Sequence, residues 1–262
     1  MPATPAWPPR STPRLFVDEP LAEGMILRID GAPAHYLRTV MRVGEGDPVK
    51  LFDDRTGEWL ATAAAAGKRD LLLTLTTLLR PREDVPDLWL LAAPLKRGRI
   101  DLVVEKACEL GIARIQPVIT RRTVIDKFKT DRLRSAAIEA AEQCDRTSLP
   151  AFAEPVALDA LLRDWPDGRT IFFADEQGGT PMAAAVAAHP GPAAILIGPE
   201  GGFDDGERAA IRAVDGAVPV SLGPRILRAE TAAIAAIGIW MAIAGDWTDS
   251  NSNPLAQPPI AR

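Results

Sequence analysis

The sequence has few of the residues from which proteins build metal sites and disulfides. It contains two cysteines, Cys108 and Cys144, and two histidines, His35 and His189, among 262 residues. The cysteines lie far apart and lack the paired spacing of a zinc site. We therefore expect no protein-bound metal, and two isolated cysteines are typical of a protein from the reducing cytoplasm.

Long hydrophobic runs are also missing. No apolar run approaches the ~18 residues that a membrane span requires, so the sequence predicts no membrane association. The proline-rich N-terminal segment lacks the hydrophobic region of a signal peptide. With 47% apolar residues the chain can still form a hydrophobic core, and its length is sufficient for two domains.

Positive charge is scarce overall but concentrated in one region. The formal net charge is −5, whereas residues 96–134 carry eleven basic and five acidic side chains, a local charge of +6. An acidic chain is not typical of nucleic-acid binding, but net charge says little when charges are segregated. The basic region is equally compatible with a nucleic-acid interface and with a solvated surface.

The chain divides into a β-rich part and a part in which strands and helices alternate. Short strand-like segments separated by turn sequences fill residues 14–80, with one short helix among them, and predict a small barrel. A charged segment with two prolines then forms a linker. Strand–helix alternation over residues 86–246 predicts an α/β domain with a mostly parallel sheet. We expect the proline-rich head, 1–13, and the polar tail, 247–262, to be disordered.

Three helices of the second part have recognisable ends or faces. One helix ends at Gly111, and another begins at Asp204, with Glu207 completing a capping box. The last helix, 229–245, is apolar nearly all round. A helix of this kind must be buried, either by the rest of its domain or by a second subunit.

Two loops after predicted strands use glycine and proline in unusual density. The first reads GPEGG, at 198–202, and the second reads SLGPRILRAET, at 221–231. Ligands of parallel sheets bind at the carboxyl ends of strands, which is where both loops lie. The first loop has no lysine and matches neither the Walker spacing nor G-x-G-x-x-G. It is therefore not a typical phosphate-binding loop.

Together, the two loops closely resemble those of the RsmE family, bacterial RNA methyltransferases of the SPOUT class. The matching stretches are LIGPEGGF at 196–203, SLGPRILRAETAAIAAI at 221–237, KACELGIARIQPV at 106–118, AAEQCDR at 140–146 and HYLRTVMRVGEGDPV at 35–49. The resemblance covers roughly residues 14–245. Ala229 departs from it, because the family pattern has threonine there.

The resemblance implies a fold, a cofactor and a reaction. The fold is an α/β SPOUT-type trefoil-knotted domain with a parallel sheet, preceded by a small PUA-like β-barrel that binds RNA. The cofactor is S-adenosyl-L-methionine, held by the knot loops of a homodimer whose second subunit completes the site. The reaction is methylation of N3 of a uridine in 16S ribosomal RNA, either naked or in the assembled 30S subunit. Ribose 2′-O methylation and RNA binding without catalysis are the alternatives.

The resemblance also assigns the cofactor to the two loops. Glycines let backbone groups approach a ligand without an intervening Cβ, and Glu200 can accept hydrogen bonds or lie near a positive sulfonium. Glycines that only serve turn geometry are the alternative. The predicted cofactor-binding residues are Ile197, Gly198, Pro199, Glu200, Gly201, Gly202, Ser221, Leu222, Gly223, Ile226, Leu227 and Arg228.

Arg228 and Glu230 are the predicted catalytic residues. Methylation at uracil N3 requires removal of the imide proton and stabilisation of the charge that spreads onto O2 and O4. A carboxylate can do the first and an arginine the second. Arg225 and Arg228 also precede a predicted helix, where positive charge opposes the helix dipole, so an anionic ligand is inferred. An arginine that pairs with Glu200 or Glu230 is the alternative, and Glu230 could instead orient Arg228 or cap the helix.

Basic residues of both parts are candidates for contacts with RNA phosphates. They are Arg14, Arg38, Arg42, Lys96, Arg121 and Arg122. His35 and Tyr36 could stack on a base, but we expect them, like Trp59 and Trp89, to lie in the core.

Overall fold

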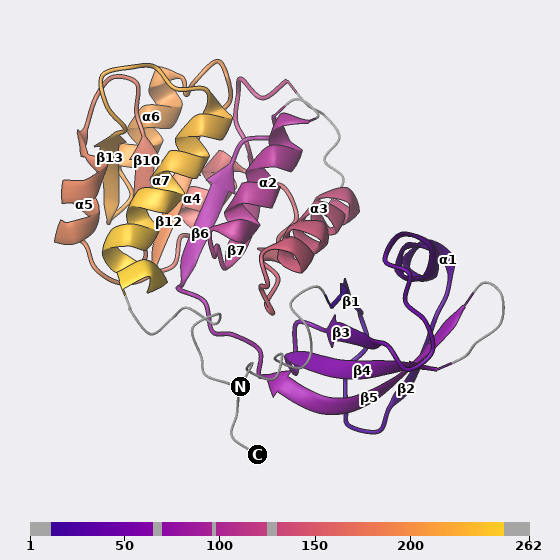
Figure 1. The fold of residues 1–262 in the computed structure, drawn as a ribbon. Coiled ribbons are helices and arrows are strands. Elements are labelled where there is room, and N and C mark those ends of the chain that lie inside the picture. The colour runs from indigo at the N-terminus through magenta and orange to yellow at the C-terminus, as the bar shows by residue number, and fades with distance from the viewer. Residues whose placement is uncertain (1–11, 65–69, 96–97, 125–129, 249–262) are drawn as a thin grey trace. The chain divides into compact units, whose positions relative to one another are not determined.

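The computed structural model describes residues 12–64, 70–95, 98–124 and 130–248, which form two compact units (Figure 1). Of these residues, the first unit holds 12–84 and 141–148, and the second holds 85–140 and 149–248. None of the helices in the described ranges is long and apolar enough to cross a membrane.

The first unit is a curled five-stranded sheet in the order β1-β3-β4-β5-β2. Its strands are β1 (Arg14–Phe16), β2 (Ile26–Ile29), β3 (Pro48–Phe52), β4 (Glu58–Ala64) and β5 (Leu71–Arg80). Strands β1 and β3 pair in parallel, and the other pairs are antiparallel. Alternate residues such as Val49, Leu51 and Leu73 fill its core, and Trp59 packs against that core as expected.

One helical segment crosses this unit. It consists of α1 (Gly31–His35) and a π-helical turn, η1 (Tyr36–Val40), and corresponds to the one short helix predicted in this part of the chain. Ala34 and Leu37 are buried, three positions apart. His35 and Tyr36 therefore point outward and are exposed, so the prediction that they lie in the core is wrong.

Arg14 belongs to the interior of the first unit. Its side chain is 5% exposed, and its Nε donates to Glu58 Oε1 at 2.5 Å. Its guanidinium also donates to the carbonyls of Ala141 and Arg146. Burial would raise the pKa of Glu58, but the hydrogen bond from Arg80 and the charge of Arg14 hold this pKa below its usual value. The prediction that Arg14 contacts RNA is wrong, because all its donors face inward.

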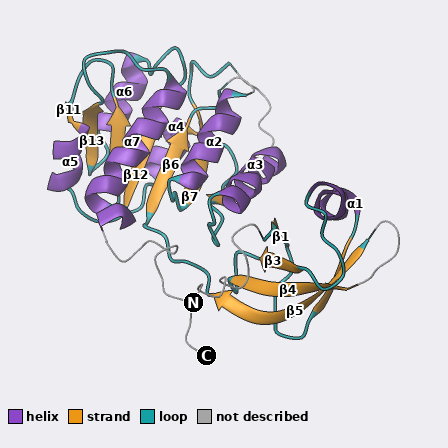
Figure 2. Cartoon of the chain, in the orientation of Figure 1, coloured by secondary structure: helices purple, strands orange, loops and turns teal. Residues whose placement is uncertain are grey.

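The second unit is an α/β domain with an eight-stranded sheet (Figure 2). The strand order is β11-β13-β10-β12-β6-β7-β8, with β9 paired to β7, and every pairing is parallel. The strands are β6 (Leu88–Ala92), β7 (Arg114–Ile119), β8 (Ala151–Phe152), β9 (Val156–Ala157), β10 (Thr170–Ala174), β11 (Thr180–Pro181), β12 (Ala193–Ile197) and β13 (Ala217–Ser221). The predicted parallel sheet is confirmed.

Helices cover both faces of this sheet. They are α2 (Arg99–Glu109), α4 (Leu158–Arg163), α5 (Met182–Ala188), α6 (Asp205–Arg212) and α7 (Ala229–Ala244). Helix α3 (Thr130–Gln143) lies beside α2, where the Cys108 thiol donates to the Ala137 carbonyl at 3.3 Å. Helix α7 packs between α2 and α5, and α4 packs with α6 behind the sheet (Figure 1). The predicted capping box at Asp204 and Glu207 is confirmed. A short 3-10 turn, η2 (Asp246–Thr248), follows α7 and includes the first two residues of the predicted tail. The rest of that tail, and residues 1–11 of the predicted head, lie outside the described residues.

Candidate functional site

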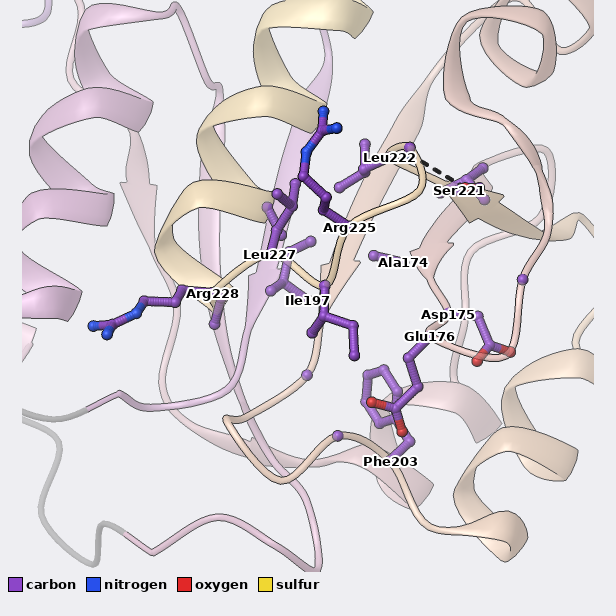
Figure 3. A pocket seen from close by; sticks show the side chains of 18 of the residues that line it. Ala174, Asp175, Glu176, Ile197, Phe203, Ser221, Leu222, Arg225, Leu227 and Arg228 are labelled. Carbon is purple, nitrogen blue, oxygen red and sulfur yellow. Dashed lines mark hydrogen bonds between the residues drawn. The ribbon is translucent and has the colours of Figure 1, made fainter.

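A cavity of about 450 Å³ lies where three neighbouring strands of the second unit end (Figure 3). Strand β10 pairs in parallel with both β12 and β13, so the loops that follow these strands meet at one edge of the sheet. The lining comes from the ends of these strands, the three loops, Arg208 of α6, and Ala229 and Ala232 of α7. This position is where open parallel sheets bind ligands.

The two predicted loops both line the cavity. Eleven of the twelve predicted cofactor-binding residues contribute to the wall: Ile197, Gly198, Pro199, Glu200, Gly202, Ser221, Leu222, Gly223, Ile226, Leu227 and Arg228. Gly201 does not. A Cβ on Gly201 would lie 3.3 Å from Cδ of Arg122, and Nη1 of Arg122 donates to the Gly201 carbonyl at 2.6 Å. Gly201 thus faces Arg122 and lies outside the lining of this cavity, and its predicted contact with the cofactor stays a prediction.

The glycines of the first loop serve two different purposes. Gly202 has φ +66°, a left-handed conformation that favours glycine, and its N–H donates to the Pro199 carbonyl at 2.9 Å. Gly198 instead permits close packing, because a Cβ there would lie 3.1 Å from the ring of buried Phe203. Turn geometry therefore explains Gly202, while the cavity wall needs Gly198 to be small.

The third loop, after β10, was missed by the sequence analysis. Ala174, Asp175, Glu176 and Gly178 line the cavity from this side. The Asp175 carboxylate is fully buried and binds Arg208 Nε at 3.1 Å and Arg212 Nη2 at 2.7 Å. Glu176 accepts from Arg208 at 2.6 Å and stays half-exposed. The available signal was a glycine pair soon after a predicted strand, the same signal that identified the other two loops.

The ionised Asp175 carboxylate should stabilise the folded protein at neutral pH but not in acid. Burial would raise its pKa, but the N–H of Gln177 and the two arginines hold this pKa below its usual value. Asp175→Asn should lower the free energy of unfolding by about 3 kcal/mol at neutral pH, because Arg208 is 8% exposed and loses a charged partner. A depressed carboxyl pKa contributes stability above its unfolded value of ~3.9, and this stability disappears as the pH falls through the folded-state pKa. Urea unfolding should therefore show a smaller difference in unfolding free energy between wild type and Asp175→Asn in acid than at neutral pH. An equal difference at both pH values would contradict a stabilising role for the ionised Asp175 carboxylate.

The loop after β13 presents its arginines outward. Arg225 and Arg228 are both exposed, and in Figure 3 their guanidinium groups point away from Asp175 and Glu176 and in different directions. Arg228 is the N-cap of α7 and makes no capping hydrogen bond through its side chain. Ile226 is 92% exposed. This loop thus offers two cations and an apolar side chain to a large ligand at the rim of the cavity.

Glu230 lies outside the cavity lining. Its side chain is 12% exposed and pairs, among the described residues, with Arg99, whose Nε lies 3.8 Å from Oε1. Arg99 also lies 3.8 Å from Glu200. An arginine therefore does lie beside Glu200 and Glu230, but it is Arg99 rather than Arg225 or Arg228. Arg99 is not among the site residues predicted from the sequence.

The predicted RNA-binding residues fall in two places. Arg121 and Arg122 are exposed and lie beside the first loop, where Arg121 pairs with Asp204 at 2.9 Å. Arg38 and Arg42 are exposed on the first unit. Arg42 has φ +57°, an uncommon backbone conformation for arginine. Lys96 lies outside the described residues.

Comparison with known proteins identifies both units. Residues 82–241 match the model of an RNA methyltransferase domain, and residues 29–76 match that of an RNA methyltransferase PUA domain. The chain is 30% identical over 228 residues to ribosomal RNA small subunit methyltransferase E of Rickettsia conorii, covering 86% of this chain and 93% of the relative. The Synechocystis protein of the same name is 33% identical over 215 residues, covering 79% of this chain and 69% of the relative.

Solved structures agree with this assignment. Ribosomal RNA small subunit methyltransferase E of Neisseria gonorrhoeae, bound to S-adenosyl methionine, superposes with a TM-score of 0.81 at 26% identity, covering 90% of this chain and 99% of the other. The predicted fold class, a SPOUT-type α/β domain after a PUA-like barrel, is confirmed. The chain belongs to the family of ribosomal RNA small subunit methyltransferase E.

Proposed function

We propose that this protein transfers a methyl group from S-adenosylmethionine to N3 of a uridine in 16S ribosomal RNA. The main support for this proposal is the cavity at the ends of β10, β12 and β13. Its wall includes residues from both loops that match the family, 198–202 and 221–231. Its relatives are named for methylation of small-subunit ribosomal RNA. A substrate in the ribosome also implies that the protein works in the cytoplasm.

Several features of the cavity suit S-adenosylmethionine. Glycines and backbone groups at 198–202 and 221–223 permit close approach, and Leu222 and Leu227 offer apolar walls suited to adenine. Glu176 and Glu200 bring carboxylates to the wall, which suit hydroxyl groups and positive charge. When bound, S-adenosylmethionine would supply a methyl group from its positive sulfonium, whose sulfur becomes a neutral thioether once the methyl group is transferred.

The chain's own residues must make uracil N3 a nucleophile. Glu230 is our candidate for accepting the imide proton, after which the electron pair left on N3 forms the new bond to carbon. Between these two events the uracil is an anion whose negative charge spreads onto O2 and O4. Arg228 at the cavity rim is our candidate for stabilising this charge. Both residues belong to the segment that ends the second loop and begins α7.

Nucleoside analysis tests the reaction directly. Purified protein is incubated with S-adenosylmethionine and 30S subunits or 16S RNA from a strain lacking the enzyme, and the RNA is digested and analysed by mass spectrometry. We expect N3-methyluridine. A ribose-methylated nucleoside would replace the proposed reaction with 2′-O methylation, and cofactor binding without any methylated product would indicate an RNA-binding role.

We further propose that the PUA-like domain, residues 14–80, contributes affinity for RNA and that the methyltransferase domain spans residues 86–246. The exposed Arg38 and Arg42 support the first part of this division, because cations on a surface can pair with phosphates. Arg121 and Arg122 lie near the cavity and are candidates for contacting RNA close to the target uridine.

We also propose that the protein is a homodimer that uses the outer face of α7. Ala233, Ala236 and Trp240 are buried against the domain, but Ile234, Ala235, Gly238 and Ile239 on the other side are only partly covered. A second copy would bury these apolar side chains.

Sedimentation should therefore give roughly twice the chain mass of 28.1 kDa. Ile239→Glu should shift the protein toward the monomer, since it places a charge in the proposed interface. Ile26→Glu is the matched control, because Ile26 is 63% exposed on the first unit. A wild-type monomer that remains active at micromolar concentration would exclude the proposed dimer.

A further inference from the structure

Arg99 connects the cofactor loop with the first turn of α7. It is the first residue of α2, and its Nη1 lies 3.8 Å from Glu200 Oε1 while its Nε lies 3.8 Å from Glu230 Oε1. Glu200 lines the cavity, whereas Glu230 lies outside its lining. One guanidinium is therefore placed between a carboxylate of the cofactor site and the candidate base.

Glu230 has few other partners. Its Oε2 is buried and accepts no hydrogen bond from the described residues. Helix α5 and strand β12, which both pack on α7, contain no charged residue. A buried carboxylate oxygen without a hydrogen bond is destabilising and rare in native proteins. Within the described part of the chain, Arg99 is the cation that pairs with Glu230.

The position of Arg99 is not explained by the stability of α2. A positive charge at the start of a helix opposes the helix dipole. The N-cap is satisfied without it, because Asp101 Oδ2 accepts from the Gly98 N–H at 3.0 Å. Both ion pairs of Arg99 are also longer than a hydrogen bond. Arg99 is thus not committed to either carboxylate and can shift toward one of them.

We infer that Arg99 is a positioning residue for methyl transfer, coupling the cofactor loop to Glu230. This inference rests on the proposed function, in which Glu230 accepts the N3 proton. The positive sulfonium of bound S-adenosylmethionine would compete with Arg99 for Glu200. The ion pair between Glu200 and Arg99 would then weaken, and the guanidinium would shift toward Glu230. The same cation holds the Glu230 carboxylate in place for the incoming proton. Arg99 need not touch the cofactor or the uracil for this role.

A double-mutant cycle in the full-length protein tests the coupling. The measurements are the single-turnover rate of N3-methyluridine formation in 30S subunits and the calorimetric affinity for S-adenosylmethionine. Arg99→Ala should lower the rate by up to about a hundredfold, the scale of a misplaced catalytic group, and should weaken cofactor binding much less. In a Glu230→Gln background the same change should have little further effect, because both residues act in one step. Arg99→Lys should recover part of the rate.

Lys106→Ala is the matched control. Lys106 lies on the same helix and pairs with Glu105 and Glu109, so its loss removes one positive charge without touching the site. Its rate should equal that of the wild type. Losses from Arg99→Ala and Glu230→Gln that simply multiply, or an unchanged rate in folded Arg99→Ala, would overturn the inference. If Arg99→Ala does not fold, the cycle is run with Arg99→Lys, and multiplying losses there would overturn it equally. Failure of the proposed function is distinguishable, because the wild-type protein would then form no N3-methyluridine.

Discussion

Arg228→Ala should lower the single-turnover rate of methylation by about a hundredfold or more, the scale of losing one donor that stabilises a developing negative charge. The uracil becomes anionic only as its proton leaves, so a nearby guanidinium binds more strongly along the reaction. Interactions that strengthen in the transition state affect the rate more than the affinity. Affinity for S-adenosylmethionine should change little, because a positive sulfonium gains nothing from a nearby arginine.

The structure makes the Arg228 experiment interpretable. Arg228 is exposed and makes no capping hydrogen bond through its side chain, so its replacement should leave the fold intact. Arg225→Ala is the natural comparison, since Arg225 is also exposed and belongs to the same loop. We expect a smaller loss from Arg225→Ala. Normal turnover in Arg228→Ala, with a large loss in Arg225→Ala, would move the catalytic role to Arg225.

The sequence was most informative where backbone geometry restricts residue type. Parallel strands end at one edge of a sheet, so glycine-rich loops after 193–197 and 217–221 were expected to meet. Pattern alone could not orient each residue within a loop. Gly201 and Gly202 are adjacent and equally small, yet Gly202 lines the cavity while Gly201 faces Arg122. The difference depends on backbone dihedral angles and on a residue 79 positions away in the chain.

Charged residues were the least predictable from sequence. Arg14 was expected at the surface, but Glu58 and two carbonyls provide partners for it in the interior. Arg99 was one of eleven basic residues in its region, and nothing in its neighbours shows that Glu200 and Glu230 approach it. Pairing of this kind arises only when segments more than 100 positions apart pack together. The sequence therefore predicts the cofactor loops better than the charges that surround them.

The clearest test of the cofactor site compares two glycines of one loop. Gly198→Val should weaken binding of S-adenosylmethionine by roughly five- to 150-fold, corresponding to the 1–3 kcal/mol typical of overpacking. A Cβ at this position would lie 3.1 Å from the Phe203 ring, which is 2% exposed and has little room to move. The loop or the ring must therefore shift, and both belong to the cavity wall.

Gly201→Val is the matched variant, and the structure predicts a different result for it. Its Cβ would lie 3.3 Å from Cδ of Arg122, a contact that a shift of a few tenths of an ångström in this exposed side chain relieves. Cofactor affinity should stay within a few-fold of wild type, while contacts that depend on Arg122 should weaken. Calorimetry on both variants, with thermal unfolding to confirm that each is folded, decides between the two positions. Equal affinity in folded Gly198→Val and wild-type protein would place the cofactor elsewhere, and a large loss confined to Gly201→Val would restore Gly201 to the binding surface.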